Sequence, residues 1–410
     1  MLNYLVYAVI VIMFAVDLVI SLINYRHRKQ PVPAYVRDIF DQEKYNNWLN
    51  YTMEKLRFGL VTGGFNTALV VVLLASGFFG VVERWSSAWF SVPVLQALSF
   101  LGVIFGLQFV LSIPFSYYST FVIEEKFGFN KTTPKTFWLD QVKKLLLMVV
   151  LGGLLVWLLQ SLYLLFADRL WLFLLSAWAA LVVIIVVVFV LNTKVFVKIF
   201  NKLTPLPESP LRTRIEALAA EVGFSVKAVS VMDASRRSTK LNAFFSGLGK
   251  SREVVLYDTL MEKMDDDQIL AVLAHELGHA VHKDVPRMLG QQSIVLGLYL
   301  VLAGFVLQSD ALAQAFGLSG AHFGFGLILF SLLVTPFDLL LSIPLNFLSR
   351  KAEYAADAFS ARYVDKQSIM GALRRLTQEN LANLNPHPLY VHIHYSHPPI
   401  AERLRAIEEA

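Results

Sequence analysis

The sequence predicts a mainly α-helical protein that crosses a membrane several times and carries a smaller soluble α+β part. Three features of the 410-residue chain indicate this class: 56% of its residues are hydrophobic, only 16% are charged, and the apolar residues gather in long stretches. A soluble domain of this length keeps more charge on its surface, so much of this surface is expected to contact lipid. The chain has no cysteine, which excludes disulfide frameworks and thiolate zinc sites.

Seven stretches are long and apolar enough to cross the hydrocarbon core, which needs about 20 apolar residues in helical form. The first is a retained span and not a signal peptide, because its basic residues follow the apolar run and no small-residue cleavage site ends it. The sixth is the least clear, because Gln291 and Gln292 interrupt its start. In chain order the spans are Leu2–Tyr25, Phe58–Val82, Val92–Phe115, Leu145–Ala167, Leu170–Leu191, Met288–Leu307 and Phe323–Leu348.

Lysine and arginine residues indicate the direction of these spans, because basic loops face the cytoplasm. The loops after the first and third spans are rich in both, whereas the loops after the second, fourth and sixth are short or nearly uncharged. The N-terminus is therefore expected on the extracytoplasmic side. The membrane is expected to be the endoplasmic reticulum in a eukaryote, and the inner or plasma membrane in a prokaryote. The same basic cytoplasmic loops account for the net charge of +5, so no nucleic-acid partner is expected.

The soluble segment between the fifth and sixth spans has mixed patterning. Ser209–Val222 has helical spacing and begins with a Ser-Pro pair that is typical of a helix start. Lys227–Met232 and Glu253–Tyr257 are β-rich runs that flank Leu241–Phe245, which indicates a small sheet. Four regions follow: spans one to five (1–192), a cytoplasmic insert (193–287), spans six and seven (288–348) and a C-terminal cytoplasmic part (349–410).

The last helix of this insert carries a metal-binding motif. Asp265–Asp267 provide an N-cap and favourable charge for its first turn. Residues 274–280 read Ala-His-Glu-Leu-Gly-His-Ala, so His275 and His279 lie four residues apart on one helical face. Both imidazoles can then reach one zinc ion, and Glu276 beside them can act as the catalytic base toward a water that the metal activates. One Zn²⁺ per chain is expected.

A catalytic zinc site needs a third protein ligand, and Glu353 is the candidate. Glu353 and Asp357 lie one helical turn apart just after the last span. Glu353 can therefore bind the metal, while Asp357 accepts the other imidazole N–H of a ligand histidine. Two crossings separate this pair from the histidine motif, which places both on one side of the membrane. Each feature taken alone also has an explanation without a metal. Glu353 and Asp357 can belong to a solvated helix start, and His275 and His279 can simply pack against other residues or face water.

Three more polar residues are candidates for contact with a substrate. Asn242 either orients a substrate backbone from an edge strand or ends a turn. His397 lies in the run Tyr-Ser-His-Pro-Pro, with Arg403 after it. These two residues either stabilise an oxyanion or hold a substrate carboxylate, or they belong to a helix start with proline in its first turn. Asp284, at the end of the motif helix, has no expected role.

These motifs together resemble the CAAX prenyl protease 1 (Ste24-type) metallopeptidases. The likeness also covers residues 123–131 (Ile-Glu-Glu-Lys-Phe-Gly-Phe-Asn-Lys), 242–244 (Asn-Ala-Phe) and His397 with its two prolines, and so extends over nearly the whole chain. It implies a barrel of seven helices around a large chamber, capped on the cytoplasmic side by a gluzincin-like protease domain. It also implies that Asn242 and His397 lie beside the substrate or the oxyanion. No role follows for three residues of the third loop: Glu124, Glu125 and Asn130.

Members of that family cut near the C-terminus of prenylated CAAX proteins. The expected partners are a peptide or protein substrate, with or without a prenyl group, and membrane lipid. Ser309–His322 is shorter than the matching loop of the eukaryotic enzymes, and similar sequences occur in organisms without prenylation. Two alternatives stay open: a membrane quality-control protease of the heat-shock type, and a transporter or scaffold with a vestigial motif. Seven spans favour the CAAX-type enzyme, and the complete ligand set argues against a scaffold.

Overall fold

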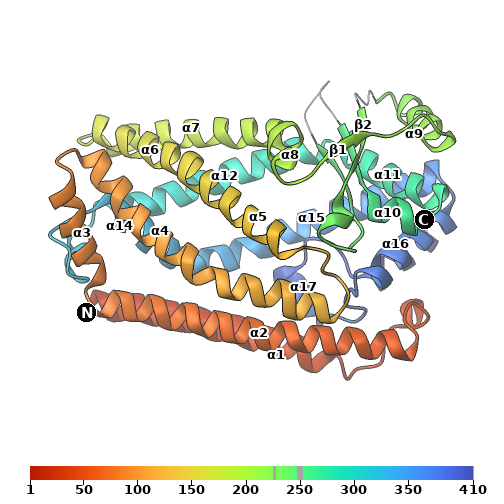
Figure 1. Ribbon diagram of the computed structural model, residues 1–410, viewed down its shortest axis with the longest axis horizontal. Coiled ribbons are helices and arrows are strands. Elements are labelled where there is room, and N and C mark those ends of the chain that lie inside the picture. The colour runs from red at the N-terminus through yellow and green to blue at the C-terminus, as the bar shows by residue number, and fades with distance from the viewer. Residues whose placement is uncertain (225–227, 247–252, 410) are drawn as a thin grey trace.

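The computed structural model describes residues 1–224, 228–246 and 253–409. Long helices run along the molecule, a small sheet with several shorter helices lies at one end, and the N-terminus lies at the other (Figure 1). The helices are α1 (Leu2–His27), α2 (Gln42–Ala75), α3 (Phe78–Trp89), α4 (Pro93–Tyr118), α5 (Pro134–Leu147), α6 (Gly153–Leu165), α7 (Leu170–Leu191), α8 (Val197–Phe200), α9 (Pro210–Glu221), α10 (Asp258–Lys263), α11 (Asp266–Val281), α12 (Asp284–Leu307), α13 (Asp310–Gln314), α14 (Phe323–Leu333), α15 (Thr335–Tyr363), α16 (Lys366–Glu379), α17 (Pro388–His394) and α18 (Ile400–Glu409).

The membrane part agrees with the seven predicted spans. In the described part of the chain, six helical runs are long and apolar enough to cross a membrane, and a bent pair of helices supplies a seventh. The weak sixth span is α12, and α5 and α6 form one continuous run through a short π-helical turn. α2 begins well before its predicted apolar stretch, so one helix joins the first loop to the membrane.

The last span differs from the prediction, which treats Phe323–Leu348 as one straight helix. α14 and α15 meet at a bend of 52°. Pro336 lies in the first turn of α15, where its ring and its missing N–H prevent the hydrogen-bonding pattern of α14 from continuing. α15 then extends to Tyr363, so a single helix leads from the bend past Glu353 and Asp357.

The predicted second span, Phe58–Val82, ends early: α2 stops at Ala75, and residues 78–89, divided in the prediction between the end of that span and a short loop, form helix α3. α3 packs with the segment that follows α13 in one apolar cluster, at the end of the molecule away from the sheet (Figure 1). Glu83 is buried there and accepts hydrogen bonds from the backbone N–H and the hydroxyl of Ser319. Gly80 permits this close approach, because a Cβ at that position would overlap the carbonyl oxygen of Gly317.

The soluble insert contains a four-stranded sheet with the order β1-β2-β4-β3. β2 and β4 are parallel, and both edge strands are antiparallel to their neighbours. The three predicted runs form β2, β3 and β4, although residue 227 lies outside the described residues. β1 is only three residues long and has no counterpart in the prediction. The strands are β1 (Leu203–Pro205), β2 (Ala228–Met232), β3 (Ala243–Ser246) and β4 (Glu253–Tyr257).

The sheet shares one apolar core with α9 and α11. Ser209 caps α9 through its hydroxyl, as its sequence predicts. α11 is buried along most of its length and crosses α15, where the Ser360 hydroxyl donates a hydrogen bond to the carbonyl of Ala271 at 2.8 Å. Gly278 lies at the same crossing, since a Cβ there would be 3.0 Å from the Cα of Ala356. Two segments that are far apart in sequence are therefore in direct backbone contact.

Candidate metal centre

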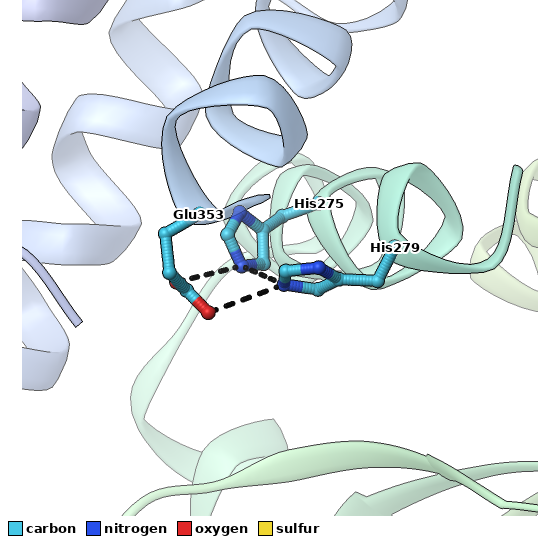
Figure 2. A group of neighbouring side chains, drawn as sticks. All are labelled: His275, His279 and Glu353. Atoms are coloured by element: carbon cyan, nitrogen blue, oxygen red, sulfur yellow. Dashed lines mark hydrogen bonds and ion pairs between the residues drawn. The ribbon is translucent and has the colours of Figure 1, made fainter. Parts of the chain in front are cut away.

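α11 carries the predicted motif and begins as predicted. The carboxylate of Asp265 accepts a hydrogen bond from the backbone N–H of Gln268 at 2.8 Å and so caps the helix. His275 and His279 are four residues apart, and both side chains project from the same face of α11 toward Glu353 (Figure 2). The crossing with α15 decides what these two imidazoles meet.

Three side chains from two helices converge at one point (Figure 2). Nε2 of His275 and Nε2 of His279 are 3.2 Å apart. The Glu353 carboxylate completes the triangle, with Oε1 at 3.3 Å from His279 Nε2 and Oε2 at 3.5 Å from His275 Nε2. Ligand atoms at about 2.0–2.1 Å from a tetrahedral zinc ion are separated by roughly 3.3–3.4 Å. The three residues therefore fit a zinc ion.

One oxygen of the Glu353 carboxylate also lacks the hydrogen bond that a buried carboxylate oxygen normally accepts. Its side chain is 6% exposed, and Oε2 accepts no hydrogen bond from any residue that the structure describes. A buried polar atom without a partner costs about 1–3 kcal/mol. A cation between this oxygen and the two imidazoles removes that cost.

Asp357 holds the far side of the His275 ring. Its Oδ1 is 2.8 Å from Nδ1 of His275, which leaves Nε2 directed at Glu353. Arg403 donates two hydrogen bonds to the Asp357 carboxylate, at 2.6 and 2.7 Å. Asp357 is 1% exposed and Arg403 12%, so this is a buried ion pair. The structure thus places Arg403 behind His275, with only Nη1 near Glu353, at 3.6 Å.

Asp284 has the same relation to His279, and the sequence did not predict it. Oδ2 of Asp284 is 3.0 Å from Nδ1 of His279. The contact depends on Lys283, whose left-handed backbone conformation (φ 59°) turns the chain between α11 and α12. In one continuous helix, residues five apart do not face each other, so spacing alone contained no signal for this pair.

The carboxylates around His275 favour positive charge at this point. Burial lowers the pKa of His275, but the neighbouring carboxylates of Asp357 and Glu353 outweigh burial and raise the pKa to about 9. A metal ion can replace that proton, because binding to a metal requires a neutral imidazole. Burial raises the pKa of Glu276 above its ordinary value, and Glu276 lines a cavity of about 750 Å³ together with His279. This glutamate is thus suited to accept protons.

The remaining predicted residues lie at two different places. Nε2 of His397 is 3.2 Å from Oε1 of Glu353, and its side chain is 63% exposed. His397 therefore belongs to the centre. Asn242 directly precedes the edge strand β3, and its Oδ1 accepts a hydrogen bond from the N–H of Ala243 at 2.9 Å. Its place is at the edge of the sheet.

The fold and the metal centre together define an integral-membrane metallopeptidase. Residues 21–202 match the family described as CAAX prenyl protease N-terminal, five membrane helices. Residues 205–410 match peptidase family M48. The chain belongs to this family of zinc metallopeptidases, and the two matches cover both its membrane helices and its soluble part.

Individual relatives agree with this assignment. The chain is 35% identical to the CAAX prenyl protease 1 homolog of Arabidopsis thaliana, over 92% of this chain and 90% of that protein. It is 32% identical to CAAX prenyl protease 1 of Saccharomyces cerevisiae, over 92% and 88% of the two chains. The crystal structure of S. mikatae Ste24p matches with a TM-score of 0.93 and 30% identity, over 100% of this chain and 99% of that chain. The predicted family, fold class and enzyme class are confirmed: the chain is a multi-pass membrane metalloendopeptidase.

Proposed function

We propose that this enzyme cleaves peptide bonds near the C-terminus of prenylated CAAX proteins, with one zinc ion held by His275, His279 and Glu353. The triangle of ligand atoms, 3.2–3.5 Å on each side, carries the proposal for the metal. The names of the relatives supply the substrate class. The adjoining cavity supports that class, because its lining combines apolar side chains of α7 and α15 with polar side chains of α12.

When bound, zinc supplies a Lewis acid that polarises the scissile carbonyl and lowers the pKa of water. Glu276 accepts the proton of the attacking water, and its raised pKa brings its basicity closer to neutral pH. The water oxygen bonds to the carbonyl carbon, the C–N bond breaks, and Glu276 returns the proton to the leaving amine. Asp357 and Asp284 keep Nδ1 of the two ligand histidines occupied, so that each Nε2 stays free.

We assign three further roles around the reacting bond. His397 donates a hydrogen bond to the carbonyl oxygen as charge develops there, and its place beside Glu353 supports this role. Asn242 orients a substrate backbone that adds to the edge strand β3, as extended peptides do at exposed sheet edges. Arg403 orients Asp357. We prefer this role to contact with a substrate, because two of its guanidinium nitrogens already bond to that carboxylate.

We place the metal centre on the cytoplasmic side of the membrane, with residues 193–287 and 349–410 forming one protease unit. The basic first loop supports this orientation by the positive-inside rule. Val36, Ile39 and Phe40 of that loop share an apolar cluster with α16 and α18. The loop and the C-terminal part thus lie on the same side.

The test is cleavage of a farnesylated CAAX peptide and of its unlipidated twin by purified protein in detergent, together with zinc analysis. We expect stoichiometric zinc and cleavage of the lipidated peptide, with both lost in His275→Ala. Glu276→Ala is expected to keep zinc and lose cleavage. Equal cleavage of both peptides would instead indicate general membrane proteolysis by the same chemistry. Bound zinc without cleavage of either peptide would reject the proposed substrate.

A further inference from the structure

The loop of residues 123–131 is conspicuous in the sequence, but the chemistry of the metal centre leaves it without a role. In the structure this loop lies against the segment 237–242, which leads into β3. Asn130 and Ser238 form an isolated β-bridge, and two neighbouring backbone hydrogen bonds join the same stretches at 3.0 and 3.1 Å. A loop between membrane helices is thus paired directly with the approach to the edge strand.

Lys240 adds a side-chain connection at the same place. Its Nζ donates hydrogen bonds to Oε2 of Glu124 and to the hydroxyl of Tyr51, both at 2.9 Å. Tyr51 in turn donates to Oε1 of Glu124 at 2.7 Å. Nζ also lies 4.5 Å from the centre of the Phe129 ring. Because Lys240 is 34% exposed and Glu124 21%, water screens this ion pair only in part.

Other contacts hold the same segment from its remaining sides. The side-chain amide of Asn380 exchanges two hydrogen bonds with the backbone of Leu241, at 2.9 and 3.1 Å. The Thr259 hydroxyl donates to the carbonyl of Lys240 at 2.9 Å. Asn242 follows directly. The position of Asn242 and of β3 therefore depends on anchors from α2, from the third loop and from the C-terminal part.

We propose that Lys240, bound by Glu124 and Tyr51, positions β3 for the substrate and so lets the membrane helices set how well a peptide binds. The inference rests on the proposed function, in which β3 and Asn242 bind the substrate backbone. Lys240 is a positioning residue, since its own contacts are with α2 and the third loop. A misplacement of about 1 Å far from the reacting atoms is enough to reduce an enzymatic rate strongly.

Lys240→Met tests this role, because it keeps much of the side-chain length and removes both hydrogen bonds. We expect kcat/KM for the peptide to fall about tenfold, mainly through KM, while zinc content stays the same. The matched control is Lys126→Met. Lys126 pairs with Glu54 at 2.6 Å and so also joins the third loop to α2, without touching 237–242. That variant is expected to stay within about twofold of wild type.

Two further variants examine the network itself. Glu124→Lys and Lys240→Glu are each expected to raise KM, and the double reversal is expected to restore most of the loss, because it re-forms the ion pair with its charges exchanged. Tyr51→Phe removes only a hydroxyl. Tyr51→Phe can therefore still test the inference if a charge variant does not fold. We expect it to raise KM less than the charge variants do.

Three results would contradict the inference. An unchanged KM in both Lys240→Met and Tyr51→Phe would overturn it. A loss of zinc or of thermal stability in step with activity would also overturn it, because the network would then only maintain the fold. If wild type and Lys126→Met both fail to cleave the peptide, the proposed function fails first, and this inference falls with it.

Discussion

Each of the two histidines proposed as zinc ligands has its own carboxylate partner. Asp357 lies behind His275 and Asp284 behind His279, at 2.8 and 3.0 Å. Such partners set the tautomer and the orientation of the ring, and they increase its basicity as a ligand. One partner comes from α15 and the other from the start of α12, so the two rings are held from different elements.

At the residue scale, Asp284→Asn is expected to weaken zinc binding about 10–100-fold, because it removes the carboxylate behind His279. Competition with a chelator measures this affinity. Asp267→Asn is the control, since Asp267 lies on α11, the helix of His279, but is 63% exposed and pairs with Arg214. Equal zinc affinity in the two variants would show that Asp284 does not support the ligand.

Arg403→Met is expected to destabilise the protein by about 3–5 kcal/mol, because it leaves the buried carboxylate of Asp357 without its cation. Thermal unfolding in detergent measures the change. Arg405→Met, on the same helix with a side chain 63% exposed, is expected to stay within about 0.5 kcal/mol of wild type. A similar loss in both variants would contradict the buried-pair interpretation.

At the scale of elements, the crossing of α11 and α15 brings Glu353, the proposed third ligand, to the two histidines. Gly278 lies at that crossing and has no Cβ to separate the helices. The Ser360 hydroxyl donates a hydrogen bond to the carbonyl of Ala271, which lies about two turns before Gly278 on α11. The distance between the helices therefore determines whether the ligand atoms form a triangle that fits zinc.

Gly278→Ala is expected to lower zinc affinity and peptidase activity together. Its Cβ would meet the Cα of Ala356 at 3.0 Å and the Cβ of Phe359 at 3.1 Å, so α15 and Glu353 must move away from α11. Zinc titration and kcat/KM measure the effect. Gly290→Ala on α12 is the control, because the added Cβ would meet no described atom within 4 Å apart from the local backbone of its own helix. Unchanged zinc affinity in Gly278→Ala would mean that the crossing relaxes without disturbing the centre.

At the scale of the whole molecule, the soluble part is attached to the membrane helices on several sides. The first loop packs against α16 and α18, and the third loop pairs with the approach to β3. α12 and α15 leave the metal centre directly as membrane helices. The protease part is therefore continuous with the membrane part, and both have a common orientation across the bilayer.

That orientation has a direct test, because the chain contains no cysteine. Lys29→Cys in the first loop and Ala311→Cys before the last span are both at exposed positions. In sealed vesicles of known sidedness, a membrane-impermeant maleimide is expected to label Ala311→Cys from the extracytoplasmic side. Lys29→Cys is expected to react only from the cytoplasmic side. Labelling of both positions from one side would contradict the predicted topology.

Local patterns in the sequence predicted the spans, three strands of the sheet, the cap of α11 and the facing histidines. Each of these depends on hydropathy or spacing within a few residues. Glu353 lies far along the chain, but an even number of crossings between the two motifs already placed it on the same side as the histidines. The bend before α15 was not predicted, because the apolar pattern continues through it. The helix α3 was missed, because its first residues continue the apolar run of the second span and its remainder contains the charges that indicated a loop.

Contacts that depend on turns and on distant packing required the tertiary structure. Asp284 reaches His279 only because Lys283 turns the chain between two helices. Tyr51 and Lys240 are 189 residues apart, and no periodicity relates them. Hydropathy and spacing predict the secondary structure of a segment and whether it contacts water, lipid or the protein interior. The partner of a buried charge is decided by which segments the folded chain brings together.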